Sequence, residues 1–270
     1  MVVQHNMQAV NTNRMLGQNV KAVAKSTEKL SSGYRVNRAA DDAAGLSISE
    51  KMRNQIRGIN QAVSNSEDGV SLIQTAEGNM NEIHSILQRM GELANKAAND
   101  VNSADERTSI NDEITQLVEE IDSISNKAEF NGTKLLTGDY TGKYLQVGAN
   151  AGQNMKISIA QMDATTLGVN SLNVSDHANA STSISAITSA IKTVSAARSL
   201  LGAVQNRLGY TINNLENYSE NLTASESTIR DTDMAAEMTT YTKNNILQQA
   251  AQSMLAQANQ STQGVLSLIQ

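Results

Sequence analysis

Histidines are the first side chains to test for chemistry in this 270-residue sequence, because they serve as bases and as metal ligands. The three histidines, His5, His84 and His177, lie far apart in the chain. None has a second histidine or a carboxylate at the spacing that a metal site on a helix requires. We interpret all three as surface residues or as members of a seam, the narrow apolar stripe along one side of a helix.

Adjacent carboxylates occur twice, at Asp41-Asp42 and at Glu119-Glu120. Neighbouring residues on a helix point to different sides, which disfavours a catalytic pair of acids. We expect these acids to cap helices, to pair with arginines such as Arg35 and Arg38, or to remain solvated.

The sequence contains no cysteine. This excludes a disulfide scaffold, a thiolate nucleophile and any cysteine-ligated metal or iron–sulfur site. The glycine-rich phosphate loop and the G-x-S-x-G pattern of serine hydrolases are missing as well. We therefore predict a protein that is not an enzyme and has no catalytic residue, no metal site and no cofactor.

The composition instead favours long helices. The chain has no proline and no tryptophan, and aromatic residues make up 3% of it. Proline breaks helices, so its absence fits helices that run without interruption. Asparagine and glutamine together equal the 48 charged residues in number. An amide-rich surface loses less on desolvation than a charged one, which suits burial against other protein.

The charge is uneven, since residues 1–40 carry six Lys or Arg and one Glu. A basic arm can bind nucleic acid or membrane, but this one lacks a basic cluster and contains a single aromatic residue. We expect its charges to meet acidic parts of the same chain or of neighbours. No apolar run approaches the ~18 residues of a membrane span, and the N-terminus lacks a secretory signal pattern. We predict no nucleic-acid partner, no membrane span and, for an exported protein, another export route.

Apolar residues recur in steps of four and three along most of the chain, the pattern of a helix with one buried seam. In the first helix the seam contains Leu16, Val20, Val23 and Leu30, and Gly33 ends the helix. Further seams predict a helix over about 46–100, a shorter one after residue 108 with its seam at 110–124, a fourth from about 180 to 229 and a last one over about 234–268. Ser103 and Glu106 form a capping signal before the third helix.

Residues 130–175 are the strand-bearing part of the chain. The segments 143–147 and 155–159 alternate apolar and polar residues, which predicts a β-hairpin. Glycines and the Asn131-Gly132 pair surround them. The predicted fold is therefore mostly α, a long antiparallel helical rod or coiled-coil bundle with one small β-hairpin region.

The two ends of the chain match each other, because both are seam-bearing helices with little charge. Neither end can bury its seam alone, so we expect the first helix to pair with the last and the pair to pack against copies of itself. This indicates a self-assembling structural subunit with its termini innermost. The alternative is a helical signalling hairpin, such as the cytoplasmic part of a chemoreceptor, which would be symmetric about its tip and attached to a membrane segment.

Long stretches of the sequence resemble bacterial flagellin. The stretches that carry the resemblance are KLSSGYRVNRAADDAAGLSISEKMRNQIRGI (29–59), NSEDGVSLIQTAEG (65–78), LQRMGELA (87–94), EFNGTKLL (129–136), LGAVQNRLGYTINNLENYSENLTASESTIRDTDMAAEM (201–238) and KNNILQQAAQSMLAQANQ (243–260). The resemblance is to a short form that lacks the variable outer domains of the family. It implies a subunit that self-assembles helically into the flagellar filament for motility, extracellular and secreted by flagellar type III export. A hook–filament junction protein of the same superfamily is the alternative.

The resemblance also implies a division of the chain. Residues 1–43 and 231–270 would form the terminal coiled-coil domain in the filament core, and residues 44–230 the rod domain with its hairpin region at 130–175. The seam residues expected in the filament core are Leu16, Val20, Val23, Leu30, Met254, Ala258, Val265 and Leu268.

Partners follow from the same resemblance: further copies of the chain, an export chaperone, and the filament cap and junction proteins. The residues expected to bind the chaperone are Ile246, Leu247, Met254, Leu255, Val265 and Leu268. Contact with a Toll-like innate immune receptor is implied for Arg89, Leu93 and Glu113. Gly91 stands where many receptor-active relatives carry arginine, so we expect a retained but weakened site. Alternatively, Arg89 and Glu113 only support packing between subunits.

Overall fold

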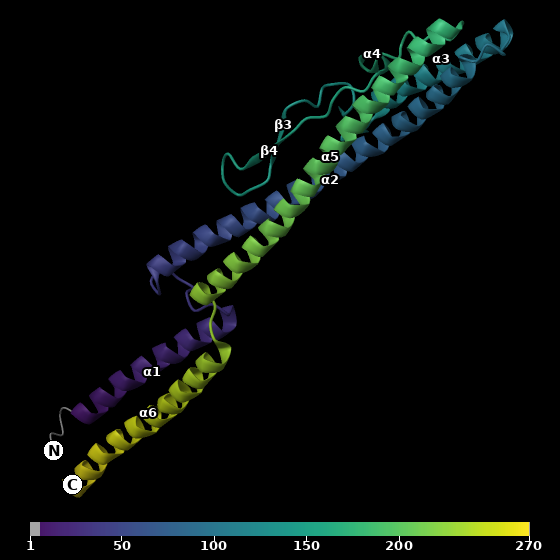
Figure 1. The fold of residues 1–270 in the computed structure, drawn as a ribbon. Helices are drawn as coiled ribbons and strands as arrows, with labels where there is room; N and C mark the ends of the chain where they lie inside the picture. The colour runs from purple at the N-terminus through teal and green to yellow at the C-terminus, as the bar shows by residue number, and fades with distance from the viewer. Residues whose placement is uncertain (1–5, 270) are drawn as a thin grey trace. The chain divides into compact units, whose positions relative to one another are not determined.

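The structure, a computed structural model, describes the backbone of residues 6–269 and the side chains of residues 6–261. Within these residues the chain is mostly helical, as predicted, and carries four short strands (Figure 1). In chain order the elements are α1 (Met7–Ser32), α2 (Ala43–Ala97), α3 (Ala104–Lys127), β1 (Glu129–Phe130), β2 (Thr133–Lys134), β3 (Lys143–Gln146), β4 (Asn154–Ile157), α4 (Ala164–Leu167), α5 (His177–Arg230) and α6 (Met234–Ile269). Helix α2 has 55 residues and begins three residues before the predicted start.

The chain divides into two compact units. The terminal unit combines Met1–Asn54 with Asn221–Gln270, and the central unit is Gln55–Glu220. Helices α2 and α5 contribute to both units. The domain boundaries expected for the filament, after residues 43 and 230, remain a prediction.

The core of the central unit is a continuous apolar layer between α2, α3, α5 and the strands. Ile83, Leu87 and Met90 of α2 are fully buried in it, as are Ile114 and Ile121 of α3. These residues follow the predicted steps of four and three, because the same side of a helix returns at that spacing. The helices can therefore close a core with almost no aromatic residues.

Local signals fix the helix ends. Gly33 ends α1 in the left-handed conformation, with φ of 75°, and its N–H donates to the Lys29 carbonyl oxygen at 2.8 Å. Ser103 and Glu106 form the predicted capping box of α3. The Ser103 N–H donates to the Glu106 carboxylate at 2.8 Å, and this bond lowers the pKa of that carboxyl group.

The predicted hairpin is present, with β3 and β4 antiparallel and Leu145 opposite Met155. Met155, Ile157 and Ile159 are buried on one side, which confirms the alternation seen in the sequence. A second, smaller hairpin, β1–β2, was not predicted. It turns at Asn131 and Gly132, whose φ angles of 49° and 74° suit a tight hairpin turn. Its two-residue strands are too short to produce a recognisable alternation.

Two glycines of α2 lie directly beneath the β3–β4 hairpin. A Cβ atom on Gly58 would come 2.9 Å from the Ala149 Cβ and 3.2 Å from its Cα. A Cβ on Gly69 would come 2.5 Å from Cδ2 of Leu145. These glycines therefore make room for the hairpin and its loop, although glycine weakens a helix by up to ~1 kcal/mol relative to alanine.

We expect Gly58→Ala to lower the stability of the protein, because the new methyl group must displace the Ala149 backbone. The matched control is Gly78→Ala on the same helix, where a Cβ has nothing within 4 Å. The control should gain up to ~1 kcal/mol of helix propensity. Urea unfolding followed by circular dichroism measures both variants. Equal stabilisation of the two would contradict the proposed role of Gly58.

Candidate functional site

Helices α1 and α6 lie side by side along the terminal unit, as the matching ends of the sequence predict (Figure 1). The Asn6 side chain donates from Nδ2 to the carbonyl oxygen of Ala258 at 2.9 Å, so residues 252 positions apart meet. Lys29 pairs with Glu237 at 3.5 Å near the other end of α1. The two ends of the chain thus form one helical pair.

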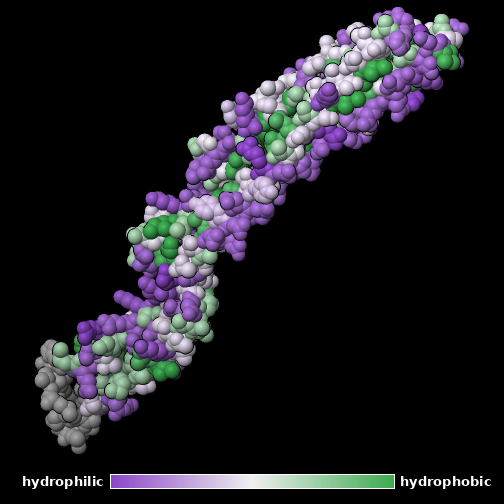
Figure 2. All heavy atoms as spheres, in the orientation of Figure 1, coloured by the Kyte–Doolittle hydropathy of each residue, from purple (hydrophilic) through white to green (hydrophobic). Residues whose placement is uncertain are grey.

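The pair covers only part of its apolar surface. Large apolar side chains are exposed along both helices, and Figure 2 shows hydrophobic and hydrophilic atoms intermingled on this part of the surface. They are Met7, Val10, Met15 and Val20 on α1 and Met234, Met238, Ile246, Leu247 and Met254 on α6. Among the described residues of the two helices, only Ser26 and Ala258 are fully buried. Two helices side by side cannot enclose a seam, because each touches only one face of the other.

The residues expected in the filament core are therefore placed in three ways. Ala258 is buried, Leu16, Val23 and Leu30 are half-buried, and Val20 and Met254 are exposed. Of the residues expected to bind a chaperone, Leu255 is half-buried, whereas Ile246 and Leu247 are exposed. Val265 and Leu268 lie outside the residues whose side chains the structure describes.

Arg230, the last residue of α5, joins several segments of the terminal unit. Its guanidinium group lies 4.7 Å from the centre of the Tyr34 ring. It donates to the Ser49 hydroxyl at 3.1 Å and to a Glu50 carboxylate oxygen at 2.6 Å. Its carbonyl oxygen accepts from the Arg35 N–H at 2.7 Å. This Arg230 clamp ties the segment after α1 to the end of α5 and the start of α2.

The neighbouring acids cap and pair, in part as expected. Asp42 accepts from the Gly45 N–H at 2.9 Å at the start of α2. Asp41 pairs with Lys25 at 2.8 Å, and this hydrogen bond lowers the pKa of the Asp41 carboxyl group. The Arg38 backbone N–H also donates to Asp41, but the Arg38 side chain pairs with Glu28. The side-chain ion pair of Asp41 is therefore with Lys25 and not with the Arg38 guanidinium.

The residues implied in receptor contact meet between α2 and α3 of the central unit. Arg89 donates to Glu113 at 2.9 Å and to Glu92 at 3.3 Å, and the Glu113 hydrogen bond raises the pKa of Arg89. Leu93 is buried in the core, whereas Arg89 and Glu113 are exposed. A Cβ on Gly91 would come near only Ile187, at an ordinary 3.7 Å, so a Cβ atom fits there without displacing a neighbour.

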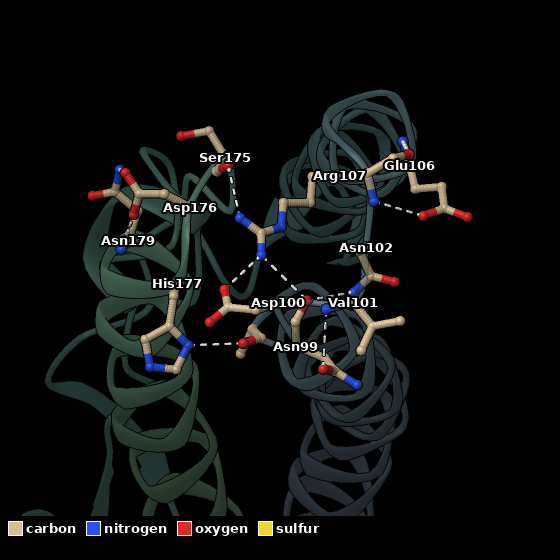
Figure 3. A network of polar contacts seen from close by, with 12 residues as sticks. Asn99, Asp100, Val101, Asn102, Glu106, Arg107, Ser175, Asp176, His177 and Asn179 are labelled. Carbon is tan, nitrogen blue, oxygen red and sulfur yellow. Dashed lines mark hydrogen bonds and ion pairs between the residues drawn. The ribbon is translucent and has the colours of Figure 1, made fainter.

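A polar network closes one end of the central unit (Figure 3). Arg107, whose side chain is mostly buried, donates to the Asn99 carbonyl oxygen at 3.2 Å and to the Asp100 carboxylate at 3.0 Å. His177 Nδ1 lies 2.7 Å from the Ala98 carbonyl oxygen. A carbonyl oxygen only accepts, so this nitrogen must carry hydrogen. His177 and Arg107 therefore fix the turns between helices, and His84 contacts Gln88 of its own helix.

A cleft of about 620 Å³ lies in the central unit between α2, α5 and the loop after β3. Tyr210, Tyr218 and Gln153 are among its lining residues, and no acid, lysine, arginine or histidine lines it. Among the described residues no cluster of His, Asp and Glu could hold a metal ion. The described helices also include none that is apolar enough over 18 residues to cross a bilayer. The exposed apolar surface of the α1–α6 pair is therefore the strongest candidate functional site.

Known proteins similar to this chain are flagellins, and the similarity extends along the whole chain. Residues 3–141 match the bacterial flagellin N-terminal helical region, and residues 184–269 match the corresponding C-terminal helical region. Similar curated proteins include flagellins of Halalkalibacterium halodurans, 52% identical, and Bacillus subtilis, 50% identical. A flagellar filament 33 kDa core protein of Treponema phagedenis is 47% identical. Each of these alignments covers all of both chains.

Solved structures resemble parts of the fold. The crystal structure of Bacillus cereus flagellin matches with a TM-score of 0.50 and 31% identity, over 56% of this chain and 88% of that one. A flagellar hook-associated protein of Vibrio parahaemolyticus matches with a TM-score of 0.61 over 71% of this chain and all of its own. At 16% identity the second likeness extends to the fold alone.

We expect Arg230→Met to loosen the junction around Tyr34, because methionine keeps part of the side-chain stem but loses the ring contact and both hydrogen bonds. The loss should be about 1–3 kcal/mol of local stability. Hydrogen exchange at the Arg35 amide measures it. The control is Arg53→Met, which removes an exposed ion pair to the same Glu50 at 3.6 Å and should change little. Equal exchange in both variants would contradict the clamp.

Proposed function

Because the chain belongs to the bacterial flagellin family and is a structural subunit of the flagellar filament, we propose that the α1–α6 pair is its main assembly surface. The observation that carries this proposal is the exposed apolar surface on both helices of the pair. Burying apolar surface stabilises an assembly by about 25 cal/mol per Å². Further copies of the same chain supply the missing partner.

The polar part of the pair supports the same role. Amide and hydroxyl side chains alternate with the apolar ones, as in Asn244-Asn245 before Ile246-Leu247 and Gln248-Gln249 after them. Amides can exchange water for hydrogen bonds across an interface, and they cost less to desolvate than charges. A surface of this kind can be buried many times over in a repeating polymer. Residues 1–43 and 231–270 would then form the filament core, and residues 44–230 its outer wall.

The same surface needs a cover before assembly. We assign this role to an export chaperone on α6, at Ile246, Leu247, Met254, Leu255, Val265 and Leu268. Ile246 and Leu247 are exposed in the isolated chain, so they are available to a chaperone and afterwards to another copy. The subunit would leave the cell by flagellar type III export, be secreted to the extracellular flagellum and meet the cap and junction proteins there.

Identity favours the filament subunit over the junction protein. The curated flagellins are 50–52% identical over the full chain, whereas the hook-associated structure shares 16%. A signalling hairpin finds no support in these comparisons. Flagellins are structural proteins, and membership of this family supports the prediction that the chain is not an enzyme.

Contact with a Toll-like innate immune receptor is a separate proposal. Arg89 and Glu113 are exposed and already hydrogen-bonded to each other, so a partner can engage both from one side. Leu93 is buried, so its role would be to hold in place the part of α2 that carries Arg89. Gly91 stands between Arg89 and Leu93 in the chain and contributes no side chain. Loss of one interface arginine typically weakens binding by 1–2 kcal/mol or more.

We expect deletion of residues 1–30 or of residues 241–270 to yield a soluble chain that does not polymerise. The point variants Val20→Gln and Ile246→Gln test the same surface with helix-forming replacements. Each should raise the critical concentration for elongation from filament seeds about tenfold, since each removes apolar surface that neighbouring subunits would bury in the filament. The control is Val101→Gln, an exposed valine in the turn after α2. Filaments of either truncated chain in electron micrographs would refute the assembly surface.

We expect Gly91→Arg to strengthen activation of the Toll-like receptor about tenfold, by restoring the arginine that many receptor-active relatives carry at this position. The Cβ of the new residue would make only an ordinary contact with Ile187. Gly78→Arg on the same helix, also with open space, is the control. A reporter-cell assay compares the half-maximal doses. If Gly91→Arg behaves like the control, Arg89 and Glu113 serve packing between subunits instead.

A further inference from the structure

Nine of the ten methionines whose side chains the structure describes fall into two groups by burial. Five lie on α1 and α6 and have 47–72% of their surface exposed; they are Met7, Met15, Met234, Met238 and Met254. Four lie in the central unit with 0–8% exposed; they are Met80, Met90, Met155 and Met162. Met52 is half-buried. The oxidisable thioethers that water can reach are thus concentrated on the proposed assembly surface.

Methionine thioethers are the only sulfur atoms in this sequence, because it has no cysteine. A hydroperoxide transfers one oxygen atom to a methionine sulfur. The S–O bond forms as the O–O bond breaks, the sulfur is oxidised by two electrons, and water or an alcohol leaves. No thiol in the protein competes for the oxidant or reduces the product.

Oxidation changes what such a side chain can do in an interface. Methionine is flexible and apolar, so it fills irregular gaps between packed helices. Its sulfoxide is polar and chiral, and it disrupts cores and methionine-rich interfaces. A sulfoxide buried between subunits would lose its hydration and would need a hydrogen-bond donor at the place that the thioether filled.

We propose that the five exposed methionines are oxidation sites of the unassembled subunit, and that a hydroperoxide acting on them withdraws the subunit from polymerisation. This inference rests on the proposed role of the α1–α6 pair. It adds that the subunit can be inactivated by oxidation only before it assembles. A subunit is sensitive while its pair is exposed, and it becomes resistant when other copies cover the same side chains.

The four central methionines provide an internal reference. Met80, Met90 and Met162 are fully buried in a close-packed core, so an oxidant reaches them only when the core opens. Their oxidation should therefore be at least about tenfold slower than that of the five exposed residues. The two groups can be compared within one sample of the full-length protein.

The experiment treats monomer and preassembled filament with dilute hydrogen peroxide. Peptide mass spectrometry measures sulfoxide at each methionine, and sedimentation measures the critical concentration for elongation from seeds. We expect oxidation of the five residues in monomer, protection of most of them in filament, and a critical concentration raised about tenfold or more. Reduction by methionine sulfoxide reductases should restore elongation. Equal oxidation of the two groups, or unchanged elongation after oxidation, would overturn the proposal.

A variant with leucine at all five positions provides the second test, since leucine has similar volume and helix propensity. Each protein is compared with its own untreated sample, so a change in basal assembly does not matter. The variant should be insensitive to peroxide, and Met155→Leu should stay as sensitive as the parent. Peroxide sensitivity retained by the five-leucine variant would contradict the inference. If the variant does not elongate at all, the reductase experiment on the oxidised parent is the test. Restored elongation supports the inference, and elongation that is not restored contradicts it. Untreated parent that fails to extend seeds would contradict the assembly surface itself, and this inference with it.

Discussion

The terminal unit is governed by a shortage of partners for its apolar side chains. Helices α1 and α6 each carry an apolar seam, but two helices can cover only the faces that they turn toward each other. Val20 and Ile246 therefore remain in water, while Ala258 is buried. In the central unit, α2 has α3, α5 and the strands around it, and its seam is closed. The proposed assembly surface rests on this difference between a complete core and an incomplete one.

Much of this could be predicted from the sequence, because helices depend on local periodicity and local caps. The seam steps, Gly33 and the Ser103–Glu106 box each act within a few residues, and the structure has all of them. The pairing of the two end helices followed from a simple argument, namely that neither seam can be buried alone. The β3–β4 hairpin was predictable because four residues are enough to produce an alternation of apolar and polar side chains.

The remaining features depend on residues far apart in the chain. Nothing near Arg230 indicates that its guanidinium stacks on Tyr34 or bonds to Glu50. The sequence places glycines within α2, but only the structure identifies the hairpin loop at Ala149 as the neighbour of Gly58. The burial of Leu93 beside the exposed Arg89 is equally a matter of packing. Methionine spacing gives no sign of exposure, since the buried Met80 and Met90 lie on a helix just as the five exposed methionines do.

The bond between Asn6 and Ala258 also has a consequence for the order of events during synthesis. A pair built from the first and last helices cannot form until almost the whole chain has been translated. Until then α1 has no partner, and an isolated helix of 26 residues without its packing surface is only marginally stable. Closing so long a loop is also a late step in folding, since its entropy must be lost before the contact forms. A surface built from both helices therefore becomes available only as synthesis of α6 ends.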